Sequence, residues 1–417
     1  MTSNALIAGS ASSAANAQPQ PRQAPRARLI AFYLPQYYPI PENDKWWGLG
    51  FTEWTNVAKA RPLFPGHRQP NVPADLGFYD LRVPETRVAQ AQMASKCGIE
   101  GFCYWHYWFG NGRRVLQRPF AEVLESGEPN FPFCLAWAND SWSGVWYGNP
   151  KTILIQQTYP GPEDEAAHFS AVLPAFRDER YVRVEGKPLF VVFNPFGLPN
   201  SNSFIAHWRQ LAVQAGLPGL FLVALANNYR DDRLAQFDAI TPHPPHDFLR
   251  ASSAPLVKRI ARRLRRRDFG PFVNQLVGDR LRRPRIYSYR DVVKTAFSEF
   301  PGPADRRFLP CVLPNWDNTP RSGRRGFVFE QSSPELFREY LVKGLALIER
   351  RSPELRICFI KAWNEWAEGN YLEPDLQFGH AYLDVIRAEM FRPVTVSETI
   401  SAPDAGLQLS DRLAGRS

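Results

Sequence analysis

The sequence of 417 residues has few cysteines and lacks the segments that mark secreted and membrane-spanning proteins. Its five cysteines are an odd number with no CxxC pair, which argues against a disulfide framework and predicts buried thiols in a reducing compartment. Residues 1–27 have no basic start and no apolar core of about 7–15 residues, so they do not read as a signal peptide. No apolar run approaches the roughly 20 residues that cross a bilayer. We therefore expect a soluble, cytoplasmic protein.

The phosphate-binding motifs of nucleotide-dependent enzymes are also missing. Neither GxGxxG nor GxxxxGKS/T occurs, which argues against a flavin or nucleotide cofactor. His243, His246 and Asp247, in the stretch PHPPHD, are a weak candidate for a metal site. We expect no cofactor and no metal.

The formal net charge of +9 is concentrated in one segment. Residues 258–285 carry eleven Lys or Arg and two Asp, so the rest of the chain is neutral. Leu256, Ile260 and Leu264 recur every four positions, which predicts a helix with arginines beside an apolar stripe. We interpret residues 255–285 as a basic helical insertion.

Such a helix suits a peripheral contact with anionic membrane at the inner membrane face. Two alternatives stay open: a solvated helix docked on the main domain, or a subsite for an acidic polysaccharide. A nucleic-acid partner is disfavoured because no nucleic-acid motif accompanies the basic segment. Residues 28–392 form the expected domain, with tails at 1–27 and 393–417; the first tail, rich in Ala, Ser, Gln and Pro, is expected to be disordered.

Short apolar runs bounded by turn residues repeat along the chain. Eight are predicted strands, at 28–34, 99–105, 132–138, 188–193, 220–226, 237–241, 309–313 and 356–362. Helix-like stretches lie between them, near 85–96, 163–176, 203–215, 290–298, 335–350 and 379–389. This alternation predicts an α/β fold, a (β/α)8 TIM-type barrel with long βα loops, in which the basic insertion follows the sixth strand.

Aromatic and polar residues gather just after these strands, and aromatics make up 13% of the chain. In a barrel the C-terminal ends of the strands converge on one face, where active sites are built. The loop at 41–75 is too long for a plain connector and is expected to be a lid or binding loop. The residues that we expect to bind a ligand on this face are Tyr37, Trp47, Glu53, Trp54, Tyr104, Trp105, His106, Trp108, Asn139, Asp140, Trp142, Asn227, His243, Asn315, Trp316 and Asn364.

Flat aromatic faces interleaved with Asn, Asp, Glu and His suit an oligo- or polysaccharide, because sugars pack C–H faces on rings and need many hydrogen bonds at the rim. Glycosidic chemistry usually uses two carboxyl groups. Glu365 and Glu368 follow the last predicted strand three positions apart, a spacing that puts both side chains on one face of a helical turn. Close carboxyls do not ionise together easily, so one keeps its proton and supplies the acid.

The stretch Trp363-Asn364-Glu365-Trp366-Ala367-Glu368-Gly369, followed by Glu373 and Pro374, resembles the NEWxEG signature of glycoside hydrolase family 99, the endo-α-mannosidases and endo-α-mannanases. The stretches IAFYLPQYYPIPEND, WWGLGFTEWTNV, GIEGFCYWHYWF and FCLAWANDSW resemble the related WbsX-type proteins more closely. Those proteins occur in bacterial surface-polysaccharide gene clusters and are usually called glycosyltransferases. The resemblance extends over residues 28–392 and leaves out the tails; the basic insertion departs from the hydrolase pattern.

The resemblance implies a (β/α)8 barrel and a reaction that retains anomeric configuration. It implies that Glu365 acts as a base on the 2-hydroxyl of the sugar, that Glu368 is the acid/base, and that a 1,2-anhydro sugar forms. Ala367 stands where the hydrolases have His, which puts their substrate preference in doubt for this chain.

Three functions remain open: a glycosidase acting inside a polysaccharide, a glycosyltransferase that builds O-antigen, capsule or lipopolysaccharide on a lipid-linked glycan, and a carbohydrate-binding barrel without activity. A conventional metal-dependent nucleotide-sugar transferase is disfavoured, because no DxD follows a Rossmann-like half.

Overall fold

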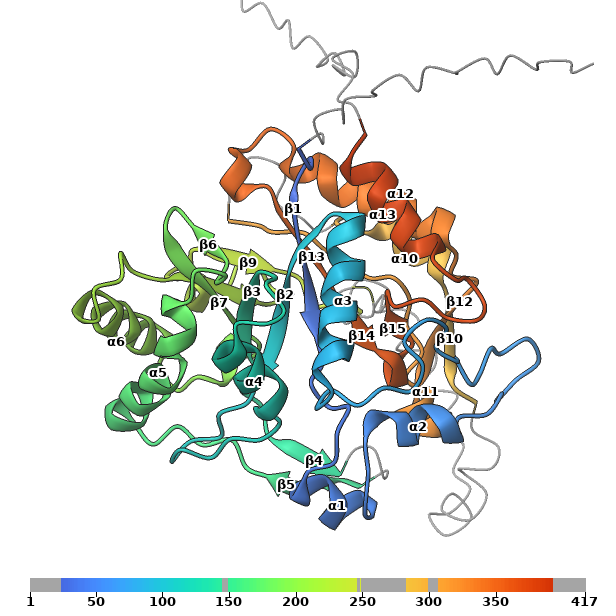
Figure 1. The fold of residues 1–417 in the computed structure, drawn as a ribbon, viewed down its shortest axis with the longest axis horizontal. Helices are drawn as coiled ribbons and strands as arrows, with labels where there is room; N and C mark the ends of the chain where they lie inside the picture. Colours follow the sequence, from blue (N-terminus) through green and yellow to red (C-terminus); the bar gives the residue numbers. More distant parts are fainter. Residues whose placement is uncertain (1–23, 145–148, 246–247, 249–282, 299–306, 393–417) are drawn as a thin grey trace, which may run out of the picture. The chain divides into compact units, whose positions relative to one another are not determined.

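The computed structural model describes residues 24–144, 149–245, 248, 283–298 and 307–392, and residues Pro25–Phe391 form one compact unit. Its centre is a ring of eight parallel strands (Figure 1). In spatial order they are β11 (Cys311–Val312), β13 (Ile357–Ile360), β1 (Arg28–Tyr33), β2 (Ile99–His106), β3 (Phe133–Trp137), β7 (Lys187–Val192), β8 (Phe221–Leu225) and β9 (Ala239–Thr241). Each lies within a predicted strand or overlaps it almost completely.

The ring closes between β9 and the residues just before β11. Ile240 N donates to Arg307 O at 2.6 Å, and Leu309 N donates to Ile240 O at 2.8 Å. Residues Ile240 and Phe308 are bridged in parallel there. The predicted (β/α)8 TIM-type barrel is therefore confirmed.

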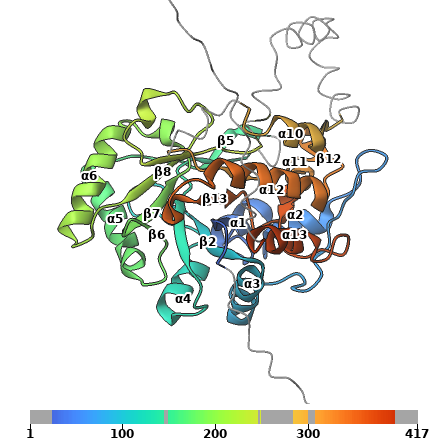
Figure 2. The same ribbon diagram turned by 90° about the horizontal axis from the view of Figure 1, so that it is seen from above.

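Helices lie outside the strands, as Figure 2 shows from above. They are α3 (Pro84–Cys97), α4 (Arg118–Ser126), α5 (Pro162–Arg177), α6 (Ser201–Gln214), α10 (Tyr289–Thr295), α12 (Pro334–Ile348) and α13 (Ala381–Met390). Proline opens α3, α5 and α12, where the missing N–H has no helical partner to lose. All six predicted helices are confirmed within two or three residues, and α4 is an addition.

Short elements surround the barrel and escaped prediction because they are too brief to show a period. The long first loop contains α1 (Pro41–Trp47) and α2 (Glu53–Lys59). The others are β4 (Trp142–Gly144), β5 (Asn149–Ile155), β6 (Arg183–Val184), η2 (Pro195–Gly197), η3 (Asp232–Leu234), β10 (Arg285–Ser288), α11 (Thr319–Ser322), η4 (Gly323–Arg325), β12 (Phe327–Glu330), η5 (Pro353–Leu355), β14 (Asn364–Glu365), η6 (Trp366–Glu368) and β15 (Asn370–Tyr371).

Side chains alternate between the barrel interior and the helix layer, as the period of a strand requires. Inside, the Phe32 ring stacks on Trp105 and on Phe359, with centroids 4.9 and 5.3 Å apart. Outside, the Tyr33 hydroxyl donates to Gln90 of α3 at 2.6 Å. The interior is thus filled by rings at the end where the βα loops begin.

All five cysteines are buried and none of them forms a disulfide, as expected for reduced thiols. In the parts of the chain that the structure describes, no helix has the length and apolarity to span a membrane. The predicted tails and the basic insertion fall almost entirely outside the described residues. At their edges, Arg26 N donates to Met390 O at 3.0 Å, and Arg285 begins β10, which pairs with β12.

Candidate active site

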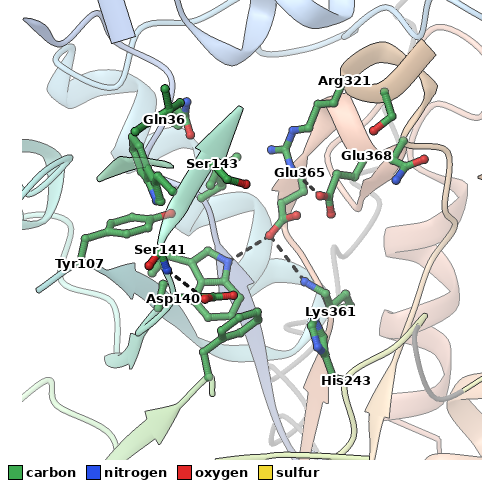
Figure 3. A pocket seen from close by; sticks show the side chains of 18 of the residues that line it. Gln36, Tyr107, Asp140, Ser141, Ser143, His243, Arg321, Lys361, Glu365 and Glu368 are labelled. Carbon is green, nitrogen blue, oxygen red and sulfur yellow. Dashed lines mark hydrogen bonds and ion pairs between the residues drawn. The ribbon is translucent and has the colours of Figure 1, made fainter. Parts of the chain in front are cut away.

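A cavity of about 480 Å³ opens at the C-terminal ends of the strands (Figure 3). Both predicted catalytic carboxyls reach it from the loop after β13. The lining residues are Leu34, Gln36, Trp47, Trp105, Tyr107, Ala138, Asp140, Ser141, Trp142, Ser143, Leu154, Phe193, His243, Trp316, Asn318, Arg321, Ser322, Lys361, Glu365 and Glu368.

The two carboxyls stand on a tight turn. Glu365 ends β14, which pairs with β15, and Glu368 ends η6 between those strands. Gly369 closes the turn at φ +59°, where a Cβ would lie 2.9 Å from the Cβ and the backbone nitrogen of Asp317. Glycine is required for both reasons, since the left-handed conformation and the close approach each exclude a side chain.

Glu365 is 5% exposed, and its Oε1 has two partners. The indole Nε1 of Trp105 donates to it at 3.0 Å, and the Nζ of Lys361 lies 3.7 Å away. Burial alone would raise the pKa of Glu365. The ammonium of Lys361, a hydrogen bond with Glu368 and the guanidinium of Arg321 outweigh burial and hold this pKa below its usual range.

The pKa of Glu368 is shifted in the opposite direction. Burial, followed by the negative charge of Glu365, raises the pKa of Glu368 above its usual range, although Arg321 acts to lower it. Arg321 makes an ion pair with Glu368 and a second one with Glu53, whose Oε2 lies 2.9 Å from Nη2. The neighbouring carboxyls therefore favour one proton between them, held on Glu368.

The turn is fastened to the barrel by its backbone and by Asn364. The Tyr37 hydroxyl donates to Asn364 O and accepts from Trp366 N at 3.2 Å. Asn364 Nδ2 donates to Leu34 O at 3.0 Å, and Leu34 N donates to Asn364 Oδ1 at 2.7 Å. These contacts fix the position from which Glu365 and Glu368 project.

Another buried carboxyl, Glu373, holds the ring of Trp366. Its Oε2 accepts from Trp366 Nε1 at 2.6 Å and from the Tyr79 hydroxyl at 2.9 Å, and its Oε1 accepts from Gln90 Nε2 at 2.6 Å. Burial raises the pKa of Glu373 to about 7 in spite of these donors. Glu373 thereby ties the turn that carries Glu365 and Glu368 to α3.

The structure brings eight of the eighteen predicted site residues to the cavity. Eight line it: Trp47, Trp105, Asp140, Trp142, His243, Trp316, Glu365 and Glu368. Ten do not line it: Tyr37, Glu53, Trp54, Tyr104, His106, Trp108, Asn139, Asn227, Asn315 and Asn364.

Three of those ten lie in or just after β2 and project outward, because neighbouring residues of a strand face opposite sides. The Tyr104 ring packs 4.5 Å from Tyr33. His106 Nε2 lies 2.9 Å from His168 Nε2 on α5, and burial lowers the pKa of His106 to about 3. Trp108 Nε1 donates to Asp164, also on α5, at 3.0 Å.

The other seven lie near the cavity without lining it. Trp54 packs on Tyr37 at 4.7 Å, and Glu53 is fully buried beneath Arg321. Asn139 Oδ1 accepts from Asn194 N at 2.7 Å, and Asn227 Oδ1 accepts from His243 N at 2.8 Å. Tyr37 and Asn364 hold the turn that carries Glu365 and Glu368. The buried Oδ1 of Asn315 has no hydrogen-bond partner among the described residues.

Sequence reasoning missed several lining residues, above all Gln36, Tyr107, Arg321 and Lys361. Tyr107 lies among the aromatics after β2 and could have been included on that ground. Arg321 belongs to α11, a helix of four residues that shows no period. No local pattern marks Gln36 or Lys361 as facing the site.

The cavity combines rings and polar groups in the manner expected for a sugar. The Phe193 ring meets Trp105 and His243 edge-on, at 5.6 and 5.0 Å, and Trp142 meets Tyr107 edge-on at 5.4 Å. Asp140, Ser141 and Ser143 face the carboxyls across the cavity (Figure 3).

The sequence matches the family described as Glycosyltransferase WbsX over residues 29–386. Two proteins from strains of Xanthomonas campestris pv. campestris, each called uncharacterized protein WxcX, are 38% identical over 381 and 384 residues. Each alignment covers 91% of this chain and 52% of the relative, so the chain spans about half the length of the curated relatives it matches.

Two solved structures have a similar fold. A glycoside hydrolase-like protein gives a TM-score of 0.54 at 14% identity, over 90% of this chain and 97% of that chain. The family 99 endo-α-mannosidase of Bacteroides thetaiotaomicron, in complex with Bis-Tris propane, gives 0.51 at 14% identity, over 87% and 95%. At this identity the likeness shows a common barrel fold. The family match, which extends from β1 into α13, shows that the chain belongs to the WbsX glycosyltransferase family of carbohydrate-active enzymes.

Proposed function

We propose that this enzyme makes or breaks glycosidic bonds with retention of configuration, using Glu365 and Glu368. The observation that carries the proposal is the division of charge between them. Lys361 Nζ lies 3.7 Å from Glu365 Oε1 and Trp105 donates to the same oxygen, which lowers the pKa of Glu365. Partial burial and the charge of Glu365, by contrast, raise the pKa of Glu368. One base and one acid side by side are what a two-carboxyl mechanism requires.

In the first step, Glu365 takes the proton of the sugar 2-hydroxyl, whose oxygen attacks the anomeric carbon as the glycosidic bond breaks. Glu368 gives its proton to the leaving oxygen, and a 1,2-anhydro sugar results. In the second step, Glu368 takes a proton from the incoming hydroxyl, which opens the anhydro ring, and Glu365 returns a proton to O2. The nucleophile decides the outcome: water gives hydrolysis, and a sugar hydroxyl gives transfer.

We place this chemistry in the metabolism of a bacterial surface polysaccharide, at the cytoplasmic side of the inner membrane and on a glycan that is lipid-linked. The family description as a glycosyltransferase supports a biosynthetic role. Five buried cysteines outside any disulfide fit a reducing compartment. The basic segment 255–285 would bring the enzyme to anionic lipid.

The catalytic assignment is tested by Glu365→Gln and Glu368→Gln, with the purified enzyme offered the surface glycan of its host and the products read by mass spectrometry. Each variant is expected to lose about 10²–10⁴-fold in rate and to keep glycan binding. A variant within a few-fold of the unaltered enzyme refutes the role of that residue. If the unaltered protein binds the glycan and never changes it, the protein is a carbohydrate-binding barrel.

The membrane contact is tested by co-sedimentation with vesicles that contain anionic lipid. Binding should weaken with salt and disappear when Arg262, Arg263, Arg265, Arg266 and Arg267 are replaced by Gln. Equal recovery in the supernatant with and without anionic vesicles would exclude it.

A further inference from the structure

Lys361 follows β13 directly and takes no part in the proton transfers proposed above. Its side chain is 5% exposed, and its Nζ lies 3.7 Å from Oε1 of Glu365. Its backbone N–H donates to Val312 O at 2.8 Å, which fixes the residue at the mouth of the barrel. Removing an ammonium from water is costly unless a countercharge compensates. The countercharge here is a candidate catalytic group.

Aromatic rings hold the same ammonium from the barrel interior. The Nζ of Lys361 lies 5.4 Å from the ring centroid of Trp105 and 6.0 Å from that of Phe32. Those two rings stack 4.9 Å apart at an interplanar angle of 14°. A cation over a ring face is attracted by the ring quadrupole, most strongly where water is excluded. Lys361 therefore has little freedom to turn away from Glu365.

Trp105 contacts both members of the pair. Its ring face attracts Lys361, and its Nε1 donates at 3.0 Å to the same Oε1 of Glu365 that the ammonium approaches. Figure 3 shows Lys361 and Glu365 pointing toward each other, with a dashed line for their ion pair. The contacts come from β1, β2 and the end of β13, so rigid elements of the barrel set the direction of the carboxylate.

The other charged groups around Glu365 do not replace the positive charge of Lys361. Arg321 of α11 faces it but is shared by Glu53 of α2 and by Glu368 of the catalytic turn. One guanidinium among three carboxyls leaves an excess of negative charge, which would favour protonation of Glu365. The same cavity is also lined by Tyr107 after β2, which adds no positive charge, by Asp140 after β3 and by His243 after β9.

We propose that Lys361 is a positioning residue that keeps Glu365 ionised and aims its carboxylate into the cavity, and so makes Glu365 rather than Glu368 the base. The inference rests on the two-carboxyl reaction proposed above. It differs from a role in which Lys361 only contacts a sugar hydroxyl, because that role leaves the titration of Glu365 in the free enzyme unchanged.

The test is a carbon-13 NMR titration of the full chain without substrate. Glutamate carboxyls carry the label, and Glu365→Gln identifies the resonance of Glu365. In Lys361→Met the midpoint of this resonance should rise by about one pH unit or more, the usual effect of an opposite charge at this range. Lys361→Arg should keep the midpoint near that of the unaltered chain. Lys343→Met, a control far from the cavity whose Nζ donates to Val293 O at 2.6 Å, should leave it in place.

An unchanged Glu365 midpoint in Lys361→Met overturns the inference. If that variant does not fold, as judged by circular dichroism, Lys361→Gln is titrated in its place under the same criterion. With an active glycan in hand, the acid limb of kcat/KM should move to higher pH by the same amount as the NMR midpoint. A shifted midpoint in a protein that acts on no glycan refutes the proposed function and leaves the electrostatic role of Lys361 standing. Activity on a glycan together with an unchanged Glu365 midpoint in Lys361→Met supports the proposed function and refutes the electrostatic role of Lys361.

Discussion

Replacing Gly369 by alanine should destabilise the catalytic turn through two separable effects. The first is backbone strain: Gly369 has φ +59°, and a left-handed conformation costs a residue with a Cβ about 1–2 kcal/mol. The second is a collision with Asp317, whose Cβ and backbone nitrogen would both lie 2.9 Å from the new carbon. Overpacking of this kind costs about 1–3 kcal/mol.

Asp317 has little room to yield. Its Oδ2 accepts from His67 Nε2 at 2.8 Å and from Gln69 Nε2 at 2.6 Å, and its backbone N donates to Glu368 O at 2.6 Å. The catalytic turn should therefore move instead. A displacement of about 1 Å at a catalytic group can cost about 10²-fold in rate.

Gly379 is the matched control, since it has φ +52° and no atom of the described residues lies within 4 Å of where an alanine Cβ would stand. Gly379→Ala should carry the strain alone and lose about 1–2 kcal/mol, whereas Gly369→Ala should lose about 2–5 kcal/mol in urea unfolding at constant m-value. The reasoning is refuted if both variants lose the same free energy of unfolding, or if Gly369→Ala keeps full activity.

Three further outcomes follow from the site. Glu53→Gln removes a negative charge from Arg321, which then acts more strongly on Glu368, so the basic limb of kcat/KM should move to lower pH; an upward move would contradict the Arg321 network. Glu373 has its pKa raised by burial from 4.5 to about 7, so the folded state binds the extra proton and stability should fall as pH rises from about 4.5 to 7; Glu373→Gln should flatten this dependence in urea unfolding, and an unaltered slope would refute it. Trp105→Phe keeps the ring over Lys361 and removes the N–H donor to Glu365; turnover should fall with little change in melting temperature, and full turnover would show that the 3.0 Å hydrogen bond is dispensable.

Most of the barrel could be predicted from the sequence because its strands are continuous apolar runs, buried on both faces and separated by turn residues. Which side chains of a strand point into the cavity is harder to predict than the strand itself. Tyr104, Trp105 and His106 were all expected at the site, although neighbours on a strand face opposite ways and Trp105 alone of the three lines the cavity.

Glu365 and Glu368 could be predicted to lie together in the cavity because they are three positions apart in one short sequence stretch. The electrostatic partners of this pair were not found, because their proximity depends on the closed barrel. Arg321 and Glu53 meet across 268 positions of sequence, and Trp105 and Glu365 across 260. No window of sequence contains such pairs.

The closure of the barrel at Ile240 also bears on how long the connection between β9 and β11 can be. One short stretch of backbone hydrogen bonds joins β9 to the residues before β11. Hydrogen exchange should be faster at Ile240 and Leu309 than at the paired centres of β1 and β2. The entropy cost of closing a loop grows only slowly with its length. The connection between β9 and β11 can therefore change in length while the other strand pairs keep their register.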